Sequence, residues 1–381
     1  MKFSKSNFLY AILFVAIFLS RIFEHGIGKY IILGFASIFF IIISIKNKRI
    51  VDNRFFIKTM LVPLFCIGYS LFIAIFNGLE HGMYMIKYFI FLLYPVVIGY
   101  LFSYSLIDKR KMINITFISL LLYTFIEDSQ VLLNMILNRN FKFLMLDTHF
   151  SVLESYSSHV FGLYFIYFLI NKEKKSYVLV SLLLMIIGNK RIVVAAALLS
   201  VFLYYFLKRI KTHKKLYILI IITCLVISQL IFVYLIYSNK LDIIMSHYNI
   251  NGMGRMSIYR NLDGYYNFSL AYTGRGLGFS MYVLDQHEYF TNNLHSDILL
   301  YYIELGFMGL IIYNILLYNL TYYISKRYKN ITLLSFILIT FTMLINYFDF
   351  ISININYTVI LYSILFSEVN DNRRKIITSN L

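Results

Sequence analysis

The sequence predicts an all-α, polytopic membrane protein with about twelve transmembrane helices and a large outer loop before the third-last helix. The first observation behind this prediction is composition: 60% of the 381 residues are hydrophobic and 14% are charged, whereas soluble proteins approach a quarter charged. The second is that apolar runs of about 20 residues, the length that crosses a bilayer, recur from end to end. We therefore expect residues 1–381 to form a single integral membrane domain.

The apolar runs give the expected elements in chain order. The first run has no small-residue cleavage site after it and a second run follows at once, so we interpret it as a retained helix rather than a signal peptide. Cys66 and Cys224 both lie inside runs and are expected to be core hydrophobes rather than a disulfide. The expected transmembrane segments are residues 7–23, 27–45, 56–76, 84–103, 112–126, 158–170, 176–188, 192–207, 216–237, 296–320, 331–347 and 351–367.

Lysine and arginine collect in every second connector, which sets the topology. Clusters such as 46–58 and 208–215 mark cytoplasmic segments, so both termini, including the tail 368–381, are expected in the cytoplasm. The protein would then be a multi-pass membrane protein. The same connectors account for the net charge of +17, and we expect no binding to nucleic acid.

One connector interrupts a long apolar run at Gly188-Asn-Lys-Arg. A single helix there would carry the basic cluster 208–215 to the outside, so we predict a hairpin. Its first arm of 13 residues spans about 20 Å, which places Lys190 and Arg191 below the outer surface. Charges at such depth face a cavity or extend to the interface, and the sequence leaves both open.

Two outer segments exceed connector length, residues 127–157 and 239–294. Long loops in such proteins are disproportionately functional. The second segment contains Arg255, Arg260 and Arg275, and Arg191 is expected on the same side of the membrane. Guanidinium groups donate paired hydrogen bonds to phosphate, so these arginines form a candidate phosphate-binding set.

Three glycines, Gly274, Gly276 and Gly278, alternate around Arg275. They would let backbone amides approach an anion closely, or they simply form a flexible turn. A soluble nucleotide-binding loop is excluded because no strand precedes them.

His295 stands where the loop re-enters the membrane. An imidazole is a candidate general base for a hydroxyl nucleophile, or it is an interfacial polar residue. Asp297 lies two residues on, so a helix turns it to another face and it is a poor partner for the imidazole. The nearest other candidates for metal binding, His149, Glu154 and His159, lack a zinc spacing, and we assign no metal and no cofactor.

Glu304 lies nine residues after His295, about 13.5 Å deeper along a helix. A carboxylate at that depth needs a partner within the bundle. The sequence leaves two roles open for Glu304: it joins helices by a hydrogen bond, or it takes up and releases a proton. Gly306 and Gly309 follow and permit close contact with another element.

Together these pieces resemble the O-antigen polymerase and ligase superfamily over residues 185–310. In that family a large periplasmic loop precedes a helix that opens with His-Asn or His-Ser; this chain has His295-Ser. Gly188-Asn-Lys-Arg-Ile-Val-Val is similar to an upstream element of the family. The other matching stretches are Gly254-Arg-Met-Ser-Ile-Tyr, Thr273-Gly-Arg-Gly-Leu-Gly-Phe, Leu294-His-Ser-Asp-Ile-Leu and Glu304-Leu-Gly-Phe-Met-Gly.

The resemblance implies a metal-independent glycosyltransferase of surface polysaccharide synthesis. Its donor would be a glycan on polyprenyl diphosphate, and its acceptor a sugar hydroxyl of the next lipid-linked repeat unit. The product would be O-antigen lipopolysaccharide, capsule or exopolysaccharide, with a chain-length regulator as a further partner. Arg191, Arg255 and Arg275 would hold the diphosphate, with Arg260 a weaker candidate, and His295 would position or deprotonate the acceptor.

Two alternatives stay open. A ligase of the same superfamily would transfer the glycan to another acceptor. A lipid-linked oligosaccharide flippase or solute transporter would concentrate polar groups and broken helices near the bilayer midplane. The sequence places its arginines and histidine in a loop instead.

Overall fold

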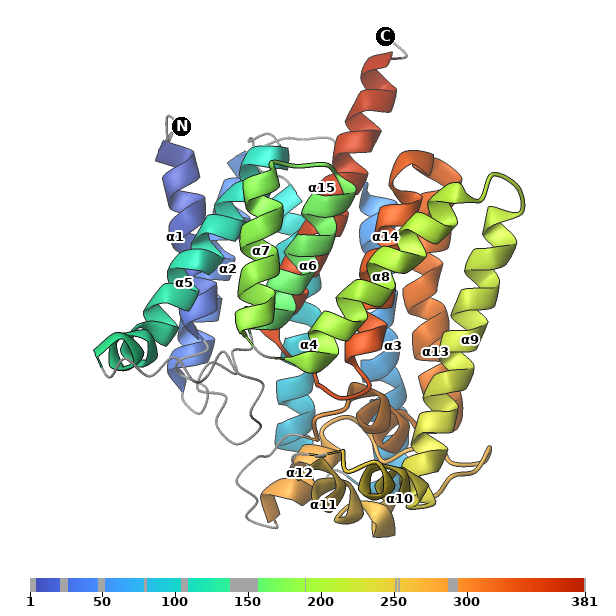
Figure 1. Ribbon diagram of the computed structural model, residues 1–381. Helices are drawn as coiled ribbons and strands as arrows, with labels where there is room; N and C mark the ends of the chain where they lie inside the picture. The colour runs from blue at the N-terminus through green and yellow to red at the C-terminus, as the bar shows by residue number, and fades with distance from the viewer. Residues whose placement is uncertain are drawn as a thin grey trace. The chain divides into compact units, whose positions relative to one another are not determined.

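The computed structural model describes residues 5–20, 27–46, 52–78, 81–103, 109–137, 157–188, 190–250, 252, 254–286 and 294–379. Over these residues the fold is entirely helical, without a strand, as predicted (Figure 1). Most of the predicted outer segment 127–157, from residue 138 to residue 156, lies outside the described residues.

Each predicted transmembrane segment coincides with a helix in the described part of the chain. These helices are α1 (Lys5–Leu19), α2 (Ile27–Lys46), α3 (Asn53–Asn77), α4 (Gly82–Ser103), α5 (Lys109–Leu137), α6 (Ser157–Ile170), α7 (Lys175–Ile187), α8 (Arg191–Arg209), α9 (Lys214–Tyr237), α13 (Asp297–Arg327), α14 (Thr332–Ile345) and α15 (Ile355–Ser379).

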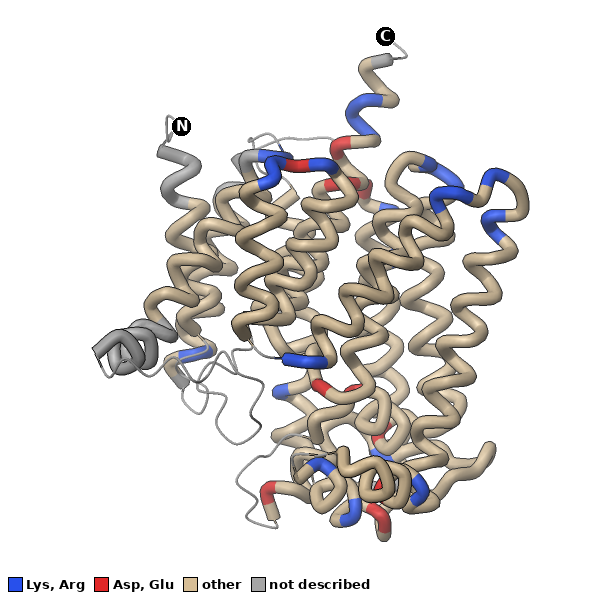
Figure 2. The backbone as a smooth tube through the Cα atoms, in the orientation of Figure 1, with Lys and Arg blue, Asp and Glu red and all other residues tan. Residues whose placement is uncertain are grey.

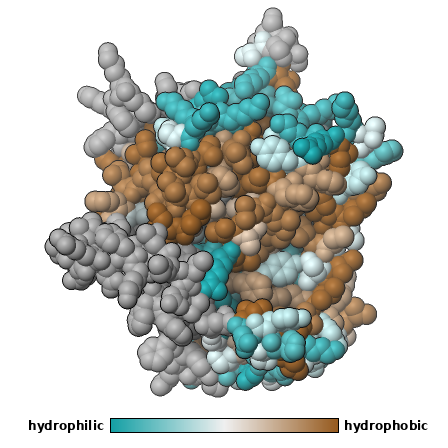
Figure 3. Space-filling model, viewed as in Figure 1, coloured by the Kyte–Doolittle hydropathy of each residue, from teal (hydrophilic) through white to brown (hydrophobic). Residues whose placement is uncertain are grey.

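Among the described helices, five are long and apolar enough to cross a membrane: α3, α4, α8, α9 and α13. Several of the others are apolar but shorter. The all-helical architecture of a polytopic membrane protein is therefore supported, while the number of twelve crossings stays a prediction. Figure 3 shows apolar side chains over the middle of the visible helices and hydrophilic ones gathered near helix ends.

The chain divides into two compact units. The first comprises Met1–Asn53, Pro95–Leu199 and Asn356–Leu381, and the second comprises Arg54–Tyr94 and Ser200–Ile355. Each unit combines distant stretches of sequence, so neither is a contiguous half of the chain.

In the first unit, α6 and α7 form a tightly packed pair joined by a short turn. The predicted hairpin is confirmed: α7 ends at Ile187 and α8 begins at Arg191. Gly188 closes α7 against α6, because a Cβ there would lie 2.7 Å from Cβ of Ser158. Of the two charges at the turn, Lys190 is buried and Arg191 is exposed.

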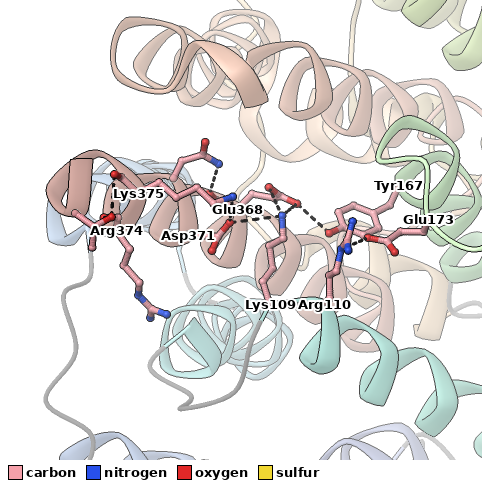
Figure 4. Close-up of polar contacts among 10 residues, drawn as sticks. Lys109, Arg110, Tyr167, Glu173, Glu368, Asp371, Arg374 and Lys375 are labelled. Carbon is pink, nitrogen blue, oxygen red and sulfur yellow. Dashed lines mark hydrogen bonds and ion pairs between the residues drawn. The ribbon is translucent and has the colours of Figure 1, made fainter. Parts of the chain in front are cut away.

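A network of charges fastens α15 within the first unit (Figure 4). The Glu368 carboxylate, buried in α15, accepts hydrogen bonds from Nζ of Lys109 at 2.9 Å and from the Tyr167 hydroxyl at 2.9 Å. Arg110 pairs with Glu173 at 3.0 Å. These contacts bring the first residues of α5 together with the α6–α7 connector and the second half of α15, while the side of the membrane on which they lie stays a prediction.

The predicted tail 368–381 continues α15 as a helix as far as Ser379. Its first turn is held from the side: Asn370 is buried, and its Oδ1 accepts from the Asp52 amide at 2.8 Å. Polarity alone could not predict this, because the partners come from distant parts of the chain.

In the second unit, short helices gather at one end of the long ones (Figure 1). They are α10 (Lys240–His247), α11 (Arg255–Arg260), η3 (Asp263–Tyr265) and α12 (Phe279–Gln286), all within the predicted loop 239–294. The basic connector between α8 and α9 lies at the opposite end of this unit (Figure 2). The loop is thus a folded layer rather than an open connector.

Replacing Glu368 with alanine tests the charge network. We expect Glu368→Ala to lower the stability of the purified protein by about 1–3 kcal/mol, since it removes the buried carboxylate that accepts hydrogen bonds from Lys109 and Tyr167. Thermal unfolding in detergent measures the loss. The matched control is Lys375→Ala, which removes an exposed lysine that pairs with Asp371 on the same helix and should cost about 0.5 kcal/mol or less. Equal losses in both variants would contradict the role of the buried pair.

Candidate functional site

The longest helix of the second unit, α13, is interrupted at Gly306. Its backbone there has φ 73° and ψ −175°, a conformation that is essentially restricted to glycine. The interruption removes helical partners from the backbone groups on either side. Buried within a protein, such groups need other partners.

The partners come from the loop segment 272–276. The amides of Arg275 and Gly276 donate to the carbonyls of Ile303 and Glu304, at 3.0 and 2.8 Å. In return the Phe307 amide donates to the Tyr272 carbonyl at 2.9 Å. The loop therefore completes the hydrogen bonding of the broken helix.

This docking requires the two backbones to touch. A Cβ at Gly274 would lie 2.5 Å from the Glu304 carbonyl oxygen, and a Cβ at Gly306 would lie 2.3 Å from that of Tyr272. The docking site is 6–10 residues inside the start of α13, about 9–15 Å along the helix axis. The segment 239–294 thus dips alongside α13 instead of lying wholly beyond its end.

Glu304 is fully buried beside the docked loop. Its Oε1 accepts from the Ser280 amide at 3.1 Å, with the Gly278 amide also facing the carboxylate. Two backbone amides near the glycine segment thus approach a carboxyl group of the chain itself. Glu304 consequently joins the loop to α13, which is the joining role considered from the sequence.

The other glycines of the segment pack against α3 and α4. A Cβ at Gly278 would lie 2.6 Å from the backbone of Tyr84, and one at Gly276 would lie 3.2 Å from Nε2 of His81. The Leu277 amide between them donates to the Ser70 hydroxyl at 3.0 Å. All three glycines therefore serve close packing in this structure.

Arg275 is held above the docked segment. Its Nε donates to the Tyr265 carbonyl at 2.9 Å, and its guanidinium lies 5.8 Å from the centre of the Phe279 ring. It also lies near Tyr272, whose pKa is raised by burial and lowered in part by this cation. These contacts, together with a side-chain hydrogen bond between Arg275 and Tyr272, hold Arg275 within the loop.

The start of α13 is tied to the connector between α14 and α15. The buried Asp297 carboxylate accepts from the amides of Ile351 and Ser352, both at 2.8 Å, and from the Ser352 hydroxyl at 2.6 Å. Its own amide donates to the Asp349 carbonyl at 3.2 Å. As expected from helix geometry, Asp297 does not contact the His295 imidazole. It binds the connector that carries Asp349, which faces this imidazole.

His295 occupies the left-handed region with φ 52°, which is uncommon for a residue with a side chain. Its Nδ1 faces the fully buried Asp349 carboxylate at 3.9 Å, and its ring lies edge-on to Phe350 at 5.5 Å. The side chain is 19% exposed. The imidazole is therefore oriented from the inside while part of it still reaches the surface.

Tyr259 connects His295 to an arginine. Its hydroxyl donates to the His295 carbonyl at 3.4 Å. Burial raises the pKa of Tyr259, the Arg255 cation lowers it in part, and the Asp349 carboxylate raises it further, which places both charges near the phenol. We call Arg255, Tyr259, His295 and Asp349 the histidine cluster. It brings together one cation, one imidazole and one carboxylate.

Two other predicted arginines, Arg260 and Arg191, are not assigned to this cluster. Arg260 is exposed and pairs with Asp242 of α10, so it anchors the loop. Arg191 belongs to the first unit, at the start of α8. Its predicted convergence with the loop arginines stays a prediction.

Sequence reasoning missed Asp349 and Tyr259. Asp349 could have been suspected, since it is an acid in a short connector that the predicted topology places on the same side as the loop. Tyr259 carries no such signal among 35 tyrosines. Among the described residues, no group of three or more His, Cys, Asp or Glu side chains is placed to hold a metal ion.

Comparison with models of protein families and with curated proteins finds no match to this chain.

Replacing Gly306 with alanine tests the docking of the loop. The substitution places a Cβ against the Tyr272 carbonyl and puts alanine in a backbone conformation that is unfavourable for it. We therefore expect the free energy of unfolding to fall by about 2 kcal/mol or more. Limited proteolysis should then cut within 272–280, which resists cleavage in the unaltered protein. Gly264→Ala is the matched control, because a Cβ added at Gly264 would meet no other part of the structure within 4 Å. Unchanged proteolysis of Gly306→Ala would contradict the docking.

Proposed function

We propose that this chain is a membrane glycosyltransferase of the polysaccharide polymerase type. It transfers a glycan from polyprenyl diphosphate to a sugar hydroxyl of the next lipid-linked repeat unit, at the outer face of the bacterial cytoplasmic membrane. The observation that supports this proposal best is the histidine cluster, which combines an oriented imidazole with a cation in a folded loop beside the bilayer.

The reaction needs two things from the protein. The bond between the anomeric carbon and the diphosphate oxygen breaks as the acceptor oxygen forms its bond to that carbon. The acceptor loses its proton to a base, and polyprenyl diphosphate departs with its charge increased. A base beside the acceptor and fixed cations beside the leaving group are therefore the useful groups.

His295 is suited to act as the base. Because Asp349 faces Nδ1, the other ring nitrogen, Nε2, is the one to take the proton from the acceptor hydroxyl. The Asp349 carboxylate lies 3.9 Å from Nδ1, beyond hydrogen-bond distance, so its role is to stabilise by its charge the imidazolium cation that forms. Asp349 thus acts through His295 in this mechanism.

Arg255 and Arg275 are suited to hold the diphosphate. Both are partly buried, where a charge acts through less water than at the surface. Tyr259 lies near Arg255 and donates to the backbone carbonyl of His295, so we assign Arg255 to the phosphate nearer the reacting carbon. Arg275, whose stem is fixed by Tyr265, is assigned to the farther phosphate. Arg191 completes the set if the two units bring it there.

A transporter is the second candidate, and one observation favours it: α13 is broken beside a buried carboxylate. Transporters use such breaks to bind ions or substrate with the freed backbone groups. Here the carbonyls of Ile303 and Glu304 already accept hydrogen bonds from the loop. This occupancy is the reason for preferring the enzyme.

Substitutions in the histidine cluster test the proposed chemistry. We expect His295→Ala to reduce polymer formation by roughly 10²–10⁴-fold through loss of the base. Arg255→Ala and Arg275→Ala should each reduce it by roughly 10²–10³-fold through loss of leaving-group stabilisation. Cells carrying these variants would accumulate single repeat units. Arg209→Ala, at the opposite end of the second unit, is the control and should keep normal polymer. Normal chain lengths in the His295 and Arg255 variants would remove the cluster from the mechanism.

Detergent solution separates the enzyme from the transporter, because it holds no compartments. Purified protein supplied with lipid-linked repeat units should extend them into longer chains. Absence of extension together with transport in sealed vesicles would favour the transporter.

A further inference from the structure

Helix α10 has an apolar face that no other part of the described chain covers. Residues Ile243 and Ile244 are 65% and 40% exposed, and no residue of this helix is buried. The helix is eight residues long and begins at Lys240, directly after Asn239, whose left-handed backbone turns the chain sharply out of α9. In Figure 1, α10 runs across the end of α9.

The two faces of α10 differ in chemistry. Leu241, Asp242 and Met245 point toward the rest of the loop: Asp242 pairs with Arg260, and the methyl end of Met245 lies against Gly252. The opposite face presents Lys240, Ile243, Ile244 and His247, at the spacing of one helical stripe. Apolar residues flanked by basic ones are typical of a helix that lies in a membrane interface.

The apolar surface of α10 continues that of α9. Only 17% of the most apolar stretch of α9 is buried, the lowest share among the five membrane-length helices in the described residues. Ile231, Tyr234 and Tyr237 are exposed along it. Nζ of Lys240 then lies 5.3 Å from the centre of the Tyr234 ring, so the surfaces of the two helices meet without a gap. Beyond α10, Tyr248 and Ile250 are 68% and 53% exposed.

We propose that α10 and the residues to Ile250 lie in the headgroup layer of the bilayer, with Ile243, Ile244 and Tyr248 in lipid. Lys240 and His247 face the phosphates of anionic lipids. The occupant of this face is therefore the membrane surface on the side where α9 ends. A bilayer fits better than a protein partner because the same apolar strip is continuous with a helix suited to cross the membrane.

The placement has a consequence for catalysis, which rests on the proposed function. Arg255 follows Ile250 by five residues, so anchoring α10 at the headgroups holds this arginine at the height of a lipid phosphate. A polyprenyl diphosphate could then present its charges to Arg255 while its tail remains in the bilayer. The inferred surface thus selects a membrane-embedded donor over a water-soluble one.

Fluorescence quenching tests the membrane contact without any substrate. In a background of Cys66→Ala and Cys224→Ala, a bimane label is attached at Ile243→Cys, and the protein is placed in phosphatidylcholine and phosphatidylglycerol vesicles. Lipids with a shallow doxyl group should quench this label several-fold more than a label at Lys211→Cys, and aqueous iodide should quench it less. A label at Ile231→Cys is the lipid-facing reference.

Two results would overturn the proposal. Iodide quenching at 243 equal to that at 211 would show that the face is in water. Quenching by neither agent, with cross-linking of two chains through position 243, would show that a second copy covers it.

The catalytic consequence is measured separately with Ile243→Glu combined with Ile244→Glu. We expect a several-fold rise in KM for the lipid-linked donor with kcat preserved. An unchanged KM with lipid quenching intact would remove only the catalytic consequence. If the unaltered protein formed no polymer at all, the proposed function would be wrong, whereas the quenching result would still show that α10 contacts the membrane.

Discussion

The second unit depends on the pairing between the loop segment 272–276 and the interrupted helix α13. A break inside a long apolar helix exposes backbone groups that neither lipid nor apolar side chains can satisfy. Loop amides donate to the carbonyls of Ile303 and Glu304, and the Tyr272 carbonyl accepts from the Phe307 amide. The Glu304 side chain accepts from the Ser280 amide and so holds the part of the loop that follows. Because Gly306 permits the break and Gly274 permits the approach, two residues without side chains govern the position of the whole loop.

The groups proposed for chemistry are positioned from the same helix. His295 lies just before the start of α13. Asp297, the first residue of α13, binds the connector that carries Asp349. Arg255 comes to this place through Tyr259, which contacts the His295 carbonyl. The candidate site is therefore attached to the start of a long helix, although several of its residues lie outside regular helices. Attachment to a regular element helps to hold a catalytic base in a fixed orientation.

Much of the fold could be predicted, since apolar length and the alternation of basic connectors located every long helix, and the break at Gly188 predicted a hairpin. The sequence also singled out His295, Glu304 and the loop arginines. It could not show that the glycine segment docks on α13, because backbone pairing between residues 28 to 35 apart leaves no periodic signal. Nor could it show that Asp349 faces His295, because that contact spans 54 residues of sequence.

The most direct measurement of the central claim is amide hydrogen exchange of the unaltered protein, resolved at the amides of Arg275, Gly276 and Phe307. If the loop completes the broken helix, these amides should exchange slowly, at rates close to those inside α13 and far below those of the exposed connector 211–213 between α8 and α9. Exchange of Arg275 and Gly276 as fast as that of this connector would show that the loop is not docked, and the positions derived for the site would fall with it.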